Sequence, residues 1–100
     1  MSDLNFNKDY EEIIEIIEEI KEKVSKNDFS EPLHEKLLLA MKKLSLINPF
    51  NNIIVDMYAE AYRLQNNKRD FLDPTTKNTV LLKFEFWKEK ITDSIDLIEL

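Results

Sequence analysis

The chain of 100 residues contains neither glycine nor cysteine. Loops that cradle phosphate groups are therefore excluded, because they need glycine to let the backbone approach the ligand closely. The sharp turn that presents a catalytic serine also depends on glycine. Without cysteine there is no disulfide, no thiol nucleophile and no cysteine-ligated zinc site. Where the backbone needs positive φ, we expect the pair Asn66-Asn67 to take the place of glycine.

Long hydrophobic runs are also missing. The longest uninterrupted apolar stretch is "LLLAM", far short of the roughly 20 residues that span a bilayer. The first residues, "MSDLNFNKDY", lack the basic segment and apolar run of a secretory signal. We therefore expect a cytoplasmic protein that binds no membrane. The bias toward Ile, Lys and Asn indicates an AT-rich genome, such as that of a low-GC bacterium or its phage.

The residues that are present are typical of a globular helical domain. Hydrophobic residues make up 43% of the chain and charged residues 34%, which is the balance of a folded protein. The apolar residues recur at intervals of three and four, the period of an α-helix. This spacing predicts an all-α, single-domain, antiparallel four-helix bundle-like fold with short connections. The expected helices cover residues 9–25, 31–47, 49–65 and 74–98.

Local signals set the expected boundaries of these helices. Four residues whose short polar side chains can accept backbone N–H groups are the predicted N-terminal caps: Asp9, Ser30, Asn48 and Asp73. Tyr58 is predicted to face the core from the third helix. Trp87 should do so from the fourth, in the middle of the most aromatic stretch of the chain.

That stretch, "VLLKFEFWK" at residues 80–88, also carries apolar side chains on a second face. Leu82 and Phe86 project opposite the stripe that includes Trp87. A strand is disfavoured because no second alternating run exists to pair with it. Stacking on nucleic acid is disfavoured too, because Glu85 and Glu89 interrupt the lysines. We therefore expect no nucleic-acid binding, and we predict that Leu82 and Phe86 anchor a homodimer or fit a groove of a partner.

The net charge is −6 at pH 7, and much of it falls on the first helix. Four acids align on the side away from its isoleucines: Glu11, Glu15, Glu18 and Glu22. Repelling acids at these spacings cost an isolated helix a few tenths of a kcal/mol per pair. Two interpretations remain open at this point. The row is either a solvated face or a recognition surface for a basic partner protein.

Acids three residues apart also occur on the first helix, as Glu12 with Glu15 and Glu19 with Glu22. In length, helical class and this spacing the chain resembles the all-α NTP pyrophosphohydrolases, which bind Mg²⁺ through Glu-x-x-Glu on one helix and Glu-x-x-Asp on the next. The resemblance implies a Mg²⁺-dependent enzyme that hydrolyses nucleoside triphosphates. No Glu-x-x-Asp follows on the next two predicted helices, so this enzyme is the alternative interpretation.

A further resemblance covers residues 40–67, which look like the junction between two tetratricopeptide repeats. The matching small and aromatic positions are Leu44, Pro49, Tyr58, Ala59 and Tyr62. The pattern fails beyond them, because Asp73-Pro74 would fall inside the next helix. Glu31 and His34 have the Glu-x-x-His spacing of carboxylate-bridged di-iron bundles, but such sites need two of these motifs. We expect no metal and no cofactor.

Together these features favour binding over catalysis. We expect no catalytic residues and interpret the chain as a small acidic protein that binds another protein. Inhibitors and neutralisers have this format, among them antitoxins, immunity proteins and phage proteins that block host defences. A structural or assembly subunit is the other alternative.

Overall fold

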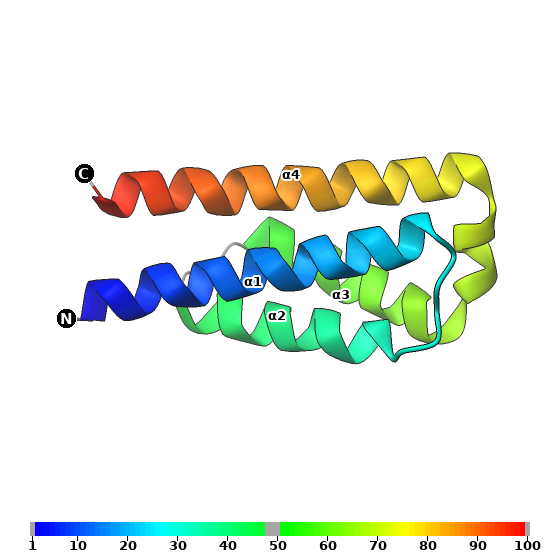
Figure 1. Cartoon of the computed structure of the whole chain (residues 1–100), viewed down its shortest axis with the longest axis horizontal. Helices are drawn as coiled ribbons and strands as arrows, with labels where there is room; N and C mark the ends of the chain where they lie inside the picture. Colours follow the sequence, from blue (N-terminus) through cyan, green and yellow to red (C-terminus); the bar gives the residue numbers. More distant parts are fainter. Residues whose placement is uncertain (1, 48–50, 100) are drawn as a thin grey trace.

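Four α-helices and one short 3-10 helix form the protein (Figure 1). The structure is a computed structural model that describes residues 2–47 and 51–99, with side chains described at 8–47 and 52–93. The elements are α1 (Ser2–Ser25), α2 (Leu33–Ile47), α3 (Asn51–Asn66), η1 (Lys68–Leu72) and α4 (Pro74–Glu99). No strand occurs over these residues. The prediction of an all-α, bundle-like fold is confirmed.

The helices are arranged in the order α3–α2–α1–α4. Close backbone packing joins α1 to both α2 and α4, and it joins α2 to α3. Over the described residues, α3 and α4 are less closely packed against each other. Figure 1 shows α1 between α4 and α2, with α3 behind it. The molecule therefore has an α1–α4 face and, on the opposite side, an α2–α3 face.

The core consists of side chains from all five elements. Trp87 is fully buried, as predicted, and its ring centroid lies 5.0 Å from that of Phe84. Phe71 of η1 is also buried, although the helical stripes did not include it. Tyr58, predicted to face the core, is instead 59% exposed. It lies about 100° round the helix from the buried Met57, beyond the width of the buried stripe.

Two helices begin at other residues than expected. Helix α1 begins at Ser2, so Asp9 lies inside it and caps nothing. The preceding residues contain no proline or glycine to stop the helix there. Helix α2 begins at Leu33 rather than at residue 31. Ser30 is not its cap, because it lies three residues before the first helical residue. Its backbone N–H and hydroxyl both donate to Asp28, at 3.1 and 2.6 Å.

Asn27, in the turn that follows α1, is the residue of the described chain with positive φ, at 56°. The N–H of Asp28 donates to the carbonyl of Lys23 at 2.8 Å, and that of Asn27 donates to Val24 at 3.1 Å. This is the Schellman pattern, in which asparagine replaces glycine. The expectation for Asn66-Asn67 was wrong, since Asn67 has φ −134°.

The cap predicted for α4 is confirmed. A carboxylate oxygen of Asp73 accepts the backbone N–H of Thr76 at 3.0 Å, and Pro74 is the first helical residue. This hydrogen bond lowers the pKa of Asp73 below its usual 3.8. Asn48, the predicted cap of the third helix, lies outside the described residues.

Candidate functional site

Ion pairs tie α1 to the helices on either side of it. Lys88 and Glu85 of α4 pair with Glu18 and Lys21. On the other side, Lys43 of α2 lies 3.3 Å from Glu12, and Lys36 lies 2.5 Å from Glu19. The paired acids of α1, Glu12, Glu18 and Glu19, lie along the two edges at which this helix meets α2 and α4. Many of the charges of α1 are therefore balanced within the chain.

The predicted acidic row is only partly balanced in this way. Glu18 pairs with Lys88, and Glu22 pairs with Lys26 one turn later at 2.8 Å. The hydrogen bond from Lys26 lowers the pKa of Glu22. Glu11 and Glu15 are exposed and have no ion-pair partner among the described side chains. Two free carboxylates thus remain on the outward side of α1.

Leu82 and Phe86 lie on the outward side of α4, 70% and 48% exposed. The Nζ atom of Lys90 lies 5.5 Å from the ring centroid of Phe86, within range of a cation–π contact. At 100° per residue, Leu82 lies about 60° round the helix from Glu85, which pairs with Lys21 of α1. Phe86 lies about 60° from Lys83, which pairs with Glu60 of α3. The two apolar residues therefore lie on the outward side of α4, Leu82 nearer the acidic row of α1 and Phe86 nearer α3.

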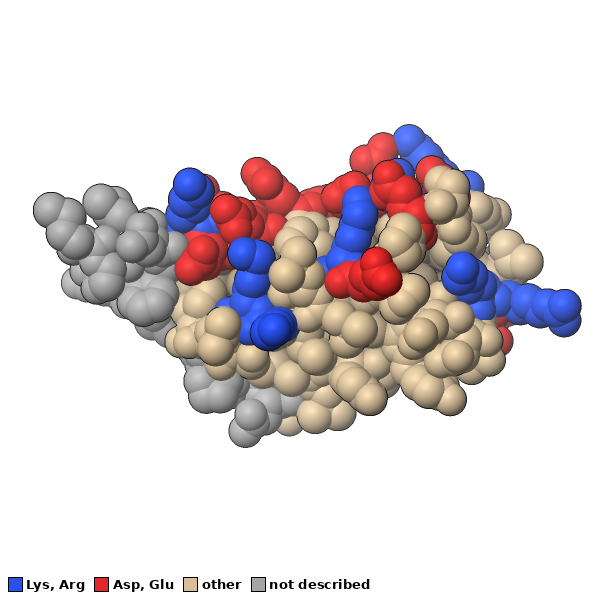
Figure 2. All heavy atoms as spheres, turned by 90° about the horizontal axis from the view of Figure 1, so that it is seen from below, with Lys and Arg blue, Asp and Glu red and all other residues tan. Residues whose placement is uncertain are grey.

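The α2–α3 face has a different character. With α2 and α3 toward the viewer, acidic side chains gather along the upper edge and a broad area below carries few charges (Figure 2). Tyr58 and Tyr62 of α3 are each 59% exposed. They line a shallow hollow of about 80 Å³ together with Leu38, Ala61 and Gln65. Sequence reasoning missed this surface because it assigned Tyr58 to the core.

A buried carboxylate lies between α3 and α4. Glu60 is 1% exposed, and its side chain lies 2.9 Å from Lys83 of α4 and 3.6 Å from Arg63. Arg63 also lies 3.9 Å from Asp70. The sequence contained a signal for this residue, because Glu60 falls at helical spacing on the stripe that contains Met57. Sequence reasoning missed it, because carboxylates are rarely buried unless they are paired, and the pairing lysine lies 23 residues away.

The acids considered for metal binding have other contacts. Glu12 and Glu19 pair with lysines of α2, as described above. Glu31 lies before α2 and accepts a hydrogen bond from Lys36 at 2.7 Å, which lowers its pKa. His34 is half-buried, and its Nδ1 has no hydrogen-bond partner. Among the side chains described, at residues 8–47 and 52–93, no three of His, Asp or Glu gather in a way that could hold a metal ion.

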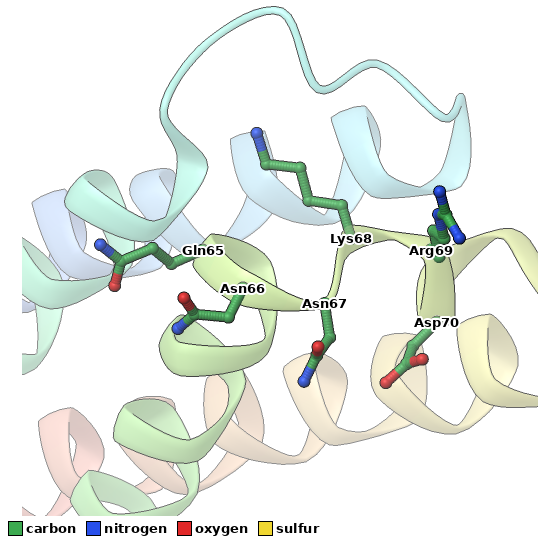
Figure 3. Close-up of a pocket in the computed structure, with 6 residues that line it drawn as sticks. All are labelled: Gln65, Asn66, Asn67, Lys68, Arg69 and Asp70. Carbon is green, nitrogen blue, oxygen red and sulfur yellow. The ribbon is translucent and has the colours of Figure 1, made fainter.

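An open hollow of about 540 Å³ lies at the turn from α3 to η1. Its lining residues are Gln65, Asn66, Asn67, Lys68, Arg69 and Asp70. Figure 3 shows that the basic side chains leave the turn on the opposite side from the asparagine and aspartate groups. These groups do not converge on a common point, as catalytic side chains must.

Comparisons with protein-family models, with curated proteins and with solved structures found no match to this chain. Among the described residues, no helix is both long enough and apolar enough to cross a membrane.

Proposed function

We propose that the protein acts by binding a basic partner protein through its α1–α4 face, and that it inhibits or neutralises this partner. The observation that supports the proposal is the exposed pair Leu82 and Phe86 on α4, the helix that packs beside the acidic row of α1. Exposed apolar side chains bordered by charge are typical of protein interfaces. The assignment as an inhibitor rests on its small, acidic format.

The two halves of this surface have different roles in the proposed interaction. The carboxylates of Glu11 and Glu15 have no ion-pair partner among the side chains that the structure describes, so they are available to a cationic surface. Charges of this kind mainly accelerate association and select the partner. Leu82 and Phe86 supply apolar area that is removed from water in the complex, and such central anchors mainly slow dissociation.

Products of neighbouring genes are the first candidates for the partner, because inhibitors are commonly encoded beside their targets. Each product would be co-expressed with the chain, and complexes would be isolated by size-exclusion chromatography. Association and dissociation rates would then be measured over a range of salt concentrations. We expect a basic protein to form a stable complex whose association slows as salt increases.

Matched variants distinguish this surface from general charge effects. Glu15→Lys should slow association several-fold and flatten its salt dependence. Glu35→Lys makes the same charge change at an exposed position of α2 and should leave the rates nearly unchanged. Leu82→Ser should accelerate dissociation without altering helicity. Equal effects of Glu15→Lys and Glu35→Lys would contradict the proposal, as would a partner that binds Leu82→Ser like the wild type.

A further inference from the structure

The outward side of α3 carries no charged residue over its four turns. Its exposed positions follow one another at helical spacing: Asn52, Val55, Ala59, Tyr62 and Asn66. Val55 is 66% exposed, and Tyr58 lies beside the row on the edge toward α2. A third of this chain is charged, and soluble surfaces are normally rich in such residues. An uncharged surface that includes an exposed valine and two exposed tyrosines is unusual for a protein of this composition.

From this surface we infer that the α2–α3 face binds a second copy of the same chain, with α3 packed antiparallel against α3 of the second copy. Charge is the reason for choosing this occupant. Each copy carries a net charge of −6, so two copies repel unless they meet where neither presents acids. The α1–α4 face would bring two acidic rows together. The outward side of α3 brings none.

The residues that flank this side fit a two-fold axis at Ala59. In a two-fold antiparallel pair, residues three or four before the axis lie opposite residues three or four after it, and equivalent edges of the helices meet. Val55 then lies against Tyr62 of the second copy. Asp56 and Arg63 share the edge toward α4, so Asp56 lies near Arg63 of the second copy. Asp56 has no ion-pair partner among the described side chains.

The side chains at the proposed contact have suitable sizes and chemistry. Ala59 has the smallest side chain of the row and lies at its centre, where it allows the two helices to approach closely. Tyr62 is large and apolar, with a hydroxyl that can remain at the wet edge of the contact. Tyrosine is among the residues that contribute most to protein interfaces.

Two single substitutions and their mixture test the surface and the register. Val55→Lys places a cation near Arg63 of the second copy, and Tyr62→Glu places an anion near Asp56 of the second copy. Each variant alone should therefore raise the dimer dissociation constant at least about tenfold. An equimolar mixture should dimerise again, because the introduced lysine of one chain then faces the introduced glutamate of the other, while the second Val–Tyr pair is intact.

Sedimentation equilibrium over a wide concentration range measures these dissociation constants, and circular dichroism verifies that each variant stays helical. Leu82→Glu is the matched control, because it puts a charge on the α1–α4 face and should leave the dimer intact. That control also separates this inference from the proposed function, which uses the opposite face.

A wild type that remains monomeric at millimolar concentration would overturn the inference. A dimer broken by Leu82→Glu, but not by Val55→Lys, would also overturn it and would place the contact on α4. If the mixture associates no better than either variant alone, the two-fold axis is not at Ala59. A monomeric wild type that loses a different protein on Tyr62→Glu would assign the face to that protein instead.

Discussion

Helices α1 and α3 differ in how many charged side chains they expose and in where their ion pairs lie. Along α1, acids and lysines pair with α2 and α4, and the outward side still carries Glu11 and Glu15. Along α3, the outward side carries no charge, and the one central acid, Glu60, is buried against Lys83. The helix richest in charge therefore uses much of it to hold the fold together. The helix poor in surface charge buries a carboxylate, that of Glu60, which costs free energy to remove from water.

This difference determines what each surface can do. A face with free carboxylates attracts cations over roughly a Debye length of 8–10 Å and repels a copy of itself. An uncharged face with exposed tyrosines has no long-range preference, but it can be dehydrated at lower cost. The proposed binding of a basic partner and the proposed dimer therefore use opposite faces and would not compete.

The largest effect is expected from the core that both faces share. Trp87→Ala should lower the free energy of unfolding by about 3–5 kcal/mol, because it leaves a cavity in the core to which all four helices contribute side chains. Urea denaturation followed by circular dichroism measures this change. Trp87→Phe is the control and should cost much less, since it keeps an aromatic ring and removes an indole N–H that has no partner in the structure. Two separate unfolding transitions in either variant would show that the faces do not depend on one core.

Breaking the contact between α3 and α4 should have the next largest effect. Lys83→Met leaves the Glu60 carboxylate buried with only the more distant Arg63, and it should cost about 2–3 kcal/mol. This is below the range for a fully buried pair, because the Lys83 side chain is 38% exposed. Lys36→Met removes the α2 lysine that pairs with Glu19 and Glu31, and it should cost less because the side chains of these two acids are 45% and 44% exposed.

The double variant Glu60→Leu with Lys83→Met provides the control for this comparison. It removes both charges, so it should be more stable than Lys83→Met alone. Urea denaturation of the two single variants and the double variant measures this coupling. A double variant that is less stable than Lys83→Met would mean that Glu60 is held by Arg63 rather than by α4.

The sequence predicted the fold because its apolar residues keep one helical period in every segment. Trp87 and Phe84 could be placed in the core on spacing alone. Boundaries were harder to predict, since Asp9 has the character of a cap but lies in a stretch that nothing interrupts. Asn27 was missed because asparagine occurs throughout this chain, and only the backbone shows which one adopts positive φ.

The candidate surfaces were predicted unevenly for a similar reason. Leu82 and Phe86 were recognised as exposed because they lie opposite an unambiguous aromatic stripe. Tyr58 was misassigned because helical spacing gives the direction of a side chain and not the width of the buried stripe. The charge of Glu18 is balanced by Lys88, which is far away in sequence, and that of Glu22 by Lys26 on the next turn. The spacing of the acids along α1 does not reveal these partners.

The smallest effect expected is a pH dependence confined to the charged side of the molecule. The hydrogen bond from Lys36 holds the pKa of Glu31 below its usual 4.5. Such a carboxyl stabilises the folded state above its unfolded pKa, and this contribution is lost as pH falls through the lower, folded pKa. The midpoint temperature of wild-type unfolding should therefore decrease more steeply below about pH 4.5 than that of Glu31→Gln, and the two should converge in acid. Thermal melts at closely spaced pH values measure this.

Glu35→Gln is the control. It removes an exposed acid that has no ion-pair partner among the described side chains, and its midpoint temperature should follow that of the wild type at every pH. Parallel curves for the wild type and Glu31→Gln would show that the ion pairs of Glu31 with Lys23 and Lys36 contribute nothing to stability.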